Sequence, residues 1–152
     1  TSYPAFFAEV GALAMGSATY EWLLQHAVKL GTPDESAWSY AQPTWVFTRR
    51  NLAVPAGADI RFVQGAVQPI HTQMKEVAGS KNIWIVGGGD LAGQFFDAGL
   101  LDELIVQIGS VTLGSGKPLF PRTVLSPTLR LHSVERYGEG MVELRYDVSK
   151  SA

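Results

Sequence analysis

Short apolar runs alternate with longer segments of helical periodicity along most of the chain. Each run lacks a polar face, which is typical of a β-strand covered on both sides. The runs are residues 12–15, 44–47, 83–86 and 104–108, and a weaker run at 59–63 is expected near a sheet edge. The predicted helices are residues 3–10, 18–30, 67–78 and 91–98, with Ser2 placed to cap the first. This alternation predicts an α/β domain with a mainly parallel sheet.

The C-terminal end has the pattern of an antiparallel hairpin. Apolar residues 142, 144, 146 and 148 alternate with Glu143, Arg145 and Asp147, which predicts a half-buried strand with its charged side chains outward. Glycines 138 and 140 provide a turn back to a strand over residues 129–137. We therefore expect residues 1–152 to form one α/β domain whose sheet is flanked by helices and ends in an antiparallel hairpin.

Composition excludes several classes of function. The chain has 12 basic and 14 acidic residues and no basic stripe, which argues against nucleic-acid binding. It has no cysteine, so disulfides and thiolate metal sites are excluded, and no histidine–carboxylate spacing suggests another metal site. No apolar run is long enough to span a membrane, and the first residues do not resemble a signal peptide. A cytoplasmic protein that acts on a small molecule is expected.

Three consecutive glycines, Gly87 to Gly89, lie between a predicted buried strand and a predicted helix. Glycines there let the backbone approach an anion, and the helix N-terminus offers unpaired N–H groups. This pattern favours a phosphate cradle over a tight turn without a ligand. The spacing also satisfies the Rossmann fingerprint, but the motif lies past mid-chain and no acidic residue follows at the ribose-binding position. A cradle from another fold is therefore expected.

Two other strand ends carry compatible residues. Gly16 and Ser17 follow the run at 12–15, and Thr48, Arg49 and Arg50 follow the run at 44–47. Taken alone, Ser17 is expected to cap a helix, and the arginines fit a solvated loop as well as a phosphate site. Because ligands of open parallel sheets bind across the carboxyl ends of the strands, the joint occurrence of these motifs predicts a dinucleotide site.

Residues 14–21, 46–49 and 85–91 resemble the three cofactor motifs of the dihydrofolate reductase fold. Residues 100–104 and 113–120 resemble one branch of it, the C-terminal reductase domain of the bifunctional riboflavin-biosynthesis deaminase-reductase. The resemblance extends from about residue 7 to residue 146. It implies a dihydrofolate reductase-like fold, NADPH as hydride donor and a homodimer.

The resemblance also assigns cofactor contacts by position. Gly16, Ser17 and Thr19 would contact the cofactor phosphates, and Thr48 and Arg49 would lie near the adenosine 2′-phosphate. The pyrophosphate would be bound by Gly87, Gly88, Gly89, Asp90 and Leu91. The family usually has a large basic residue where this chain has Ser17, which puts the strength of phosphate binding in question.

The chain departs from the family at its beginning. Family members start with an apolar strand and a loop that lines the nicotinamide and substrate pocket, whereas this sequence starts at the helix that follows. That strand is central in the family's sheet, so we expect a gap in the sheet. We also expect the natural protein to have an N-terminal segment that precedes Thr1.

No residue is identified as the proton donor. Glu9 is the only acid on the first predicted helix and is expected to face solvent, which disfavours folate reduction. The loop at 109–127 contains Lys117 and Arg122, which could meet an anionic substrate. Its apolar residues, Leu113, Pro118, Leu119 and Phe120, are expected to pack against a second subunit. The sequence thus predicts an NADPH-dependent reductase of a small heterocyclic or carbonyl compound, with a non-catalytic nucleotide-binding module as the alternative.

Overall fold

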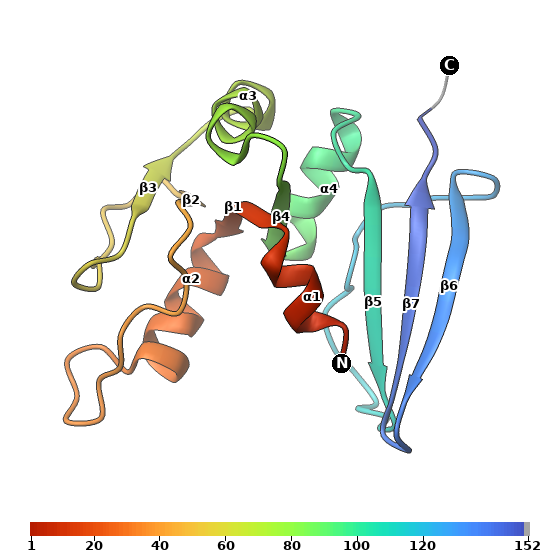
Figure 1. Cartoon of the computed structure of the whole chain (residues 1–152), viewed down its shortest axis with the longest axis horizontal. Helices are drawn as coiled ribbons and strands as arrows, with labels where there is room; N and C mark the ends of the chain where they lie inside the picture. The colour runs from red at the N-terminus through yellow and green to blue at the C-terminus, as the bar shows by residue number, and fades with distance from the viewer. Residues whose placement is uncertain (151–152) are drawn as a thin grey trace.

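The computed structural model describes residues 1–150 and contains two separate β-sheets (Figure 1). The first has four parallel strands in the order β3-β2-β1-β4, and the second has three antiparallel strands in the order β5-β7-β6. The strands are β1 (Val10–Gly16), β2 (Thr44–Phe47), β3 (Ile60–Val63), β4 (Asn82–Gly87), β5 (Glu103–Gly109), β6 (Leu129–Tyr137) and β7 (Met141–Val148). The predicted α/β class, the edge position of β3 and the C-terminal hairpin are confirmed.

The helices lie at or near their predicted positions. They are α1 (Tyr3–Ala8), α2 (Ser17–Leu23), the π-helix η1 (Leu24–Val28), α3 (Val67–Ala78) and α4 (Gly89–Asp97). The bounds of α3 agree with the prediction, whereas the helix predicted over 18–30 is α-helical in its first half and π-helical in its second. It ends at Lys29, whose left-handed backbone (φ 56°) stops the helix.

The core lies on both faces of β1, as expected for a central parallel strand. Ala12 and Ala14 face α3 and α4, where they pack with Trp45, Met74 and Phe95. On the opposite face, Met15, Tyr20 and Val46 form a second cluster beneath α2. Covering both faces holds the carboxyl end of β1 in a fixed position between its neighbours, β2 and β4.

The prediction that residues 104–108 are covered on both sides is wrong. Ile108 is 49% exposed, and Gln107 is exposed as well. The reason is that β5 is an edge strand of a second, separate sheet, and the helices of the first sheet do not cover both of its faces. An apolar run alone does not distinguish this position from a central one.

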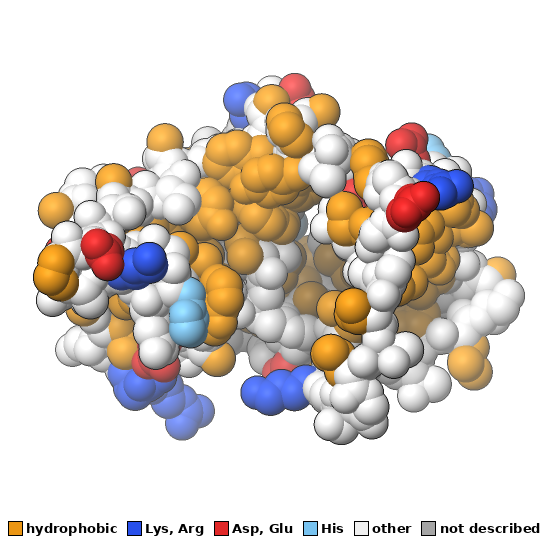
Figure 2. Space-filling view, turned by 90° about the horizontal axis from the view of Figure 1, so that it is seen from below, with side chains coloured by type: hydrophobic (Ala, Val, Ile, Leu, Met, Phe, Trp, Pro, Cys, Tyr) orange, Lys and Arg blue, Asp and Glu red, His pale blue; other side chains and the backbone are white. Residues whose placement is uncertain are grey.

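The expected gap in the sheet lies between β4 and β5. β4 pairs with β1, β5 pairs with β7, and β4 and β5 do not pair with each other. A groove of about 760 Å³ lies between the sheets and is lined by residues of both strands, among them Ile85 and Leu104. Figure 2 shows the molecule hollowed between its two halves, with hydrophobic side chains along the hollow. The N-terminal segment expected to precede Thr1 stays a prediction.

No helix within residues 1–150 is long and apolar enough to cross a membrane.

Candidate functional site

The three glycine- or arginine-bearing strand ends lie side by side. Gly16 at the end of β1 pairs with Phe47 at the end of β2, and Met15 pairs with Gly87 at the end of β4. A Cβ atom added to Gly16 would lie 3.9 Å from the backbone nitrogen of Gly88. The segments that sequence reasoning grouped into one site are therefore at one edge of one sheet.

The N-terminus of α4 is open. Gly88 is its N-cap residue, has extended backbone angles and makes no side-chain cap hydrogen bond. A Cβ atom added to Gly88 would meet nothing within 4 Å, so free space lies beside this residue. Gly87 has φ +155°, and a Cβ atom there would lie 3.1 Å from Thr19 Oγ1, which places α2 against the same turn. Unpaired N–H groups next to open space suit an anion.

Gly89 has a different role from Gly88. A Cβ atom at Gly89 would overlap the backbone carbonyl of Leu119, so the loop after β5 packs directly on the start of α4. One turn later, a Cβ atom at Gly93 would lie 2.5 Å from the guanidinium carbon of Arg122. Two of these glycines thus make room for a protein loop, while Gly88 leaves room for a ligand.

Arg122 fastens that loop to α4. Its Nη1 donates to Asp90 at 3.1 Å, and its Nε donates to Asp97 at 2.9 Å. Hydrogen bonds from Gln94 and Arg122 hold the pKa of Asp90 below its ordinary value. The guanidinium that sequence analysis left open for an anionic substrate is therefore paired with two carboxylates. Asp90 can offer only its backbone N–H to a phosphate, because an ionised carboxylate has no hydrogen to donate.

The basic loop after β2 contains two exposed arginines, of which one is ion-paired. Arg50 Nη1 lies 2.7 Å from Glu21 of α2, and the Arg50 N–H donates to Thr48 Oγ1 at 3.0 Å. Arg49 is exposed and has no ion pair among the residues that the structure describes. Of the two guanidiniums, the one at Arg49 is available to a ligand.

The surroundings of Ser17 and Leu91, two further residues predicted to bind the cofactor, differ from those that the sequence predicted. The prediction that Ser17 caps α2 is wrong, because Gly16 occupies the N-cap position and Ser17 is the first helical residue. Leu91 is buried in the core beneath α4, so its side chain packs against protein. Its backbone and the hydroxyl of Ser17 stay candidates for cofactor contact.

Within residues 1–150, the histidines make no hydrogen bond or ring contact with Gly87, Gly88 or Gly89. His71 packs against Phe95 with the ring centroids 6.2 Å apart, and burial together with Lys75 lowers its pKa. His26 and His132 are exposed, as is Glu9, which confirms the expected solvent-facing position of that acid. None of these side chains is identified as a proton donor.

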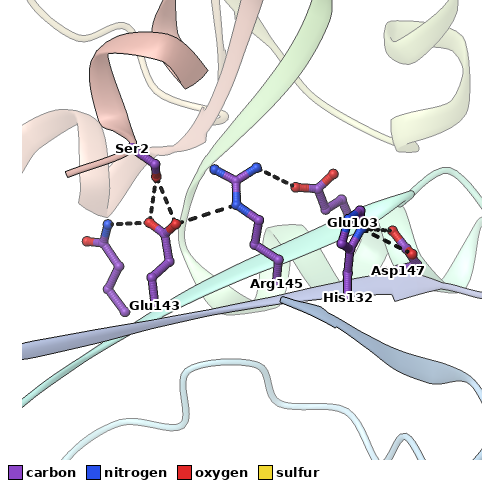
Figure 3. A network of polar contacts seen from close by, with 7 residues as sticks. Ser2, Glu103, His132, Glu143, Arg145 and Asp147 are labelled. Atoms are coloured by element: carbon purple, nitrogen blue, oxygen red, sulfur yellow. Dashed lines mark hydrogen bonds and ion pairs between the residues drawn. The ribbon is translucent and has the colours of Figure 1, made fainter. Parts of the chain in front are cut away.

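The structure reveals a buried carboxylate that sequence reasoning missed. Glu143 is 1% exposed, although the alternation in β7 predicted an outward position. Ser2 Oγ donates to its two carboxylate oxygens at 2.7 and 2.8 Å, and Gln107 Nε2 donates to Oε1 at 2.9 Å (Figure 3). The alternation was misleading because Ser2, which precedes α1, and Gln107 of β5 lie against Glu143. Ser2 makes no cap hydrogen bond to α1, contrary to the prediction, because its hydroxyl is bound to Glu143.

Glu143 is held in its ionised form. Burial by itself raises the pKa of this carboxyl, but hydrogen bonds from Gln107 and Ser2 and the charge of Arg145 outweigh burial, so the pKa lies below its ordinary value. The nearest positive group, Arg145 Nε, lies 3.4 Å from Oε2. A carboxylate whose pKa is lowered by folding stabilises the fold at neutral pH and loses that effect as acid protonates it.

Replacing Glu143 with glutamine is expected to lower the free energy of unfolding at neutral pH by about 1.5–3 kcal/mol, the range for hydrogen bonds to a charged group. The difference from the wild type should shrink as the pH falls below the ordinary range of glutamate and through the lowered pKa of the folded carboxyl. Urea unfolding at neutral and acidic pH measures both values. Glu103→Gln is the matched control, since Glu103 also bonds Arg145 but is 42% exposed. A difference that grows in acid would contradict this account.

Comparison with known proteins identifies the family. A family model described as the RibD C-terminal domain matches residues 28–143. The chain belongs to the RibD C-terminal domain family. The Bacillus subtilis (strain 168) protein YwjB is 32% identical over 145 residues, which are 95% of this chain and 77% of that protein. The resemblance stated from the sequence motifs is thereby confirmed.

Solved structures confirm the fold of this RibD C-terminal domain relative. A Shewanella sp. PV-4 protein assigned to riboflavin biosynthesis is similar with a TM-score of 0.78 and 23% identity, covering 99% of this chain and 80% of that one. Dihydrofolate reductase from Enterococcus faecalis, solved with NADP(H), gives a TM-score of 0.60 and 15% identity, covering 98% and 82%. At these identities the likeness establishes a dihydrofolate reductase-like fold.

Proposed function

We propose that this chain is an NADPH-dependent reductase of the RibD C-terminal domain family that acts on a small heterocyclic or carbonyl compound. The observation that carries the proposal is the meeting of three strand ends beside the open N-terminus of α4. Membership of the family and the NADP(H) bound by a dihydrofolate reductase of the same fold support it.

The residues at the sheet edge fit a dinucleotide phosphate. Gly88 leaves space for a pyrophosphate beside the N-terminus of α4, where a helix has unpaired N–H groups. Arg49 is exposed beside Thr48, so a guanidinium is available for a 2′-phosphate, which favours NADPH over NADH. When bound, the cofactor supplies the hydride, and this chain's residues hold and orient it.

A second candidate is a nucleotide-binding module without catalysis. It is favoured by Ser17, which stands where the family usually has a large basic residue, and by the lack of an assigned proton donor. Loss of absorbance from NADPH, measured with a panel of carbonyl and nitrogen-heterocyclic compounds, separates the two. Substrate-dependent oxidation supports the reductase, whereas saturable NADPH binding without oxidation by any compound of the panel favours the module.

We also propose that the protein forms a homodimer in the cytoplasm. Leu113 and Leu119 are 82% and 71% exposed, so a second subunit could cover the apolar loop after β5. Phe120 belongs to a different contact, because its ring packs against Phe96 of α4 at 5.7 Å. Light scattering on the purified protein measures the mass directly, and a monomer at micromolar concentration would contradict the dimer.

A further inference from the structure

Part of the loop after β5, residues 119–122, lies along one face of α4. A Cβ atom added to Gly89 would overlap the backbone carbonyl of Leu119, and one added to Gly93 would lie 2.5 Å from the guanidinium carbon of Arg122. Gly89 and Gly93 are four residues apart, so they share one face of the helix. The loop therefore runs against the helix backbone, beginning at the turn proposed to bind phosphate.

Arg122 connects this part of the loop to carboxylates at both ends of α4. Its Nη1 donates to Asp90 Oδ1 at 3.1 Å, and its Nε donates to Asp97 Oδ2 at 2.9 Å. Nη1 also donates to the backbone carbonyl of Pro121 at 2.8 Å. The side chain of Arg122 is 22% exposed, whereas that of Asp90 is 70% exposed. The guanidinium is thus held in place, with its charge against the acid in the first turn of the helix.

Asp90 places a negative charge beside the proposed phosphate site. It is the second residue of α4 and lies in its first turn. Hydrogen bonds from Gln94 and Arg122 lower the pKa of Asp90, so the carboxylate is ionised at neutral pH. An unpaired carboxylate there stabilises the helix through its dipole, but it repels a phosphate that binds to the same helix end. The positive charge of Arg122 opposes that repulsion.

We infer that Arg122 is a positioning residue for the cofactor, which neutralises the charge of Asp90 so that the N-terminus of α4 accepts a pyrophosphate. This inference rests on the proposed reductase function, because it needs a dinucleotide at this helix end. Arg122 acts through Asp90 in this role and does not touch the cofactor. Because NADPH and NADH share the pyrophosphate, Arg122 affects both equally, unlike Arg49.

Titration of Arg122→Gln and of the double variant Arg122→Gln/Asp90→Asn with NADPH and with NADH tests the inference. Arg122→Gln should weaken both cofactors by roughly three- to tenfold, the size that Coulomb's law gives for one uncompensated charge near two phosphate charges at an exposed site. The double variant should bind within about twofold of the wild type, because the repelling charge is gone. Wild-type affinity in Arg122→Gln, or a double variant as weak as Arg122→Gln, would overturn the inference. A role limited to holding the loop would not be rescued by Asp90→Asn.

Arg130→Gln is the matched control. Arg130 Nη2 lies 3.7 Å from Asp147 Oδ2 on the second sheet, so this variant breaks another arginine–aspartate pair and changes the net charge by the same amount. Its affinity for both cofactors should stay within about twofold of the wild type, as for an exposed side chain that the ligand does not touch. Equal weakening by Arg130→Gln and Arg122→Gln would show a general effect of net charge and would overturn the inference.

Asp90→Asn alone keeps the test decisive if Arg122→Gln does not fold. The Asp90 side chain is exposed, and an asparagine oxygen can still accept the hydrogen bond that Gln94 donates. Affinity for both cofactors should equal or exceed that of the wild type, and a loss of affinity in the folded variant would overturn the inference. The wild-type titration separates the two proposals. If the wild type binds NADPH, an adverse result in the variants removes only this inference, whereas absence of NADPH binding by the wild type removes the reductase as well.

Discussion

Replacing Arg49 with alanine is expected to weaken NADPH binding by roughly 10- to 100-fold, the loss typical of a charge-assisted hydrogen bond to phosphate. NADH lacks the 2′-phosphate, so its affinity should change by less than about twofold, as for an exposed side chain that the ligand does not touch. Separate titrations of the variant with the two cofactors measure the effect. Equal weakening of both would show that Arg49 does not recognise the 2′-phosphate.

Arg50→Ala is the matched control for this experiment. Arg50 is the next residue on the same loop and carries the same charge, but its guanidinium is paired with Glu21 at 2.7 Å. Its removal changes the net charge of the protein by the same amount as removal of Arg49. NADPH selectivity should therefore persist in Arg50→Ala, and loss of selectivity in both variants would point to a general effect of charge.

Gly88→Val is expected to weaken both cofactors by at least about 100-fold, because the side chain would fill the space that the pyrophosphate needs. The backbone at Gly88 is extended (φ −82°, ψ −172°) and nothing lies within 4 Å of the added Cβ. The thermal midpoint should therefore stay close to that of the wild type. Normal cofactor binding by a folded Gly88→Val protein would exclude this turn as the cradle.

Gly89→Ala is the control. It is expected to lower stability, whereas Gly88→Val is expected to weaken cofactor binding. The added methyl group would overlap the carbonyl of Leu119, so the loop has to move. We expect a loss of about 1–3 kcal/mol in the free energy of unfolding, the usual cost of overpacking. The two neighbouring glycines thus separate a binding defect from a folding defect, and calorimetry of both variants distinguishes them.

The elements around β1 could be predicted because local pattern and tertiary environment agree there. The apolar run at 44–47 and the helix at 67–78 have the bounds that the sequence indicated. The site was predictable at the level of strand ends, since carboxyl ends of parallel strands meet at one edge. Gly16 and Gly87 do lie on neighbouring strands.

The polar contacts could not be predicted because they join residues far apart in the sequence. Ser2 and Glu143 are 141 positions apart, and no local periodicity links them. The period-two pattern predicted an outward position for Glu143, but this side chain is buried and bonds Ser2, which comes from the other end of the chain. Arg122 and Asp90 are another such pair, 32 positions apart. Tertiary contacts decide the role of each of these side chains.

Titration of the protein with NADPH and, separately, with NADH tests the central claim most directly. Trp84 and Trp45 lie on strands that lead to the proposed site, so quenching of tryptophan fluorescence reports binding. We expect saturable binding of NADPH, tighter than that of NADH by about tenfold or more, as one charge-assisted phosphate contact provides. No saturation with either cofactor would contradict the dinucleotide site and, with it, the proposed reductase.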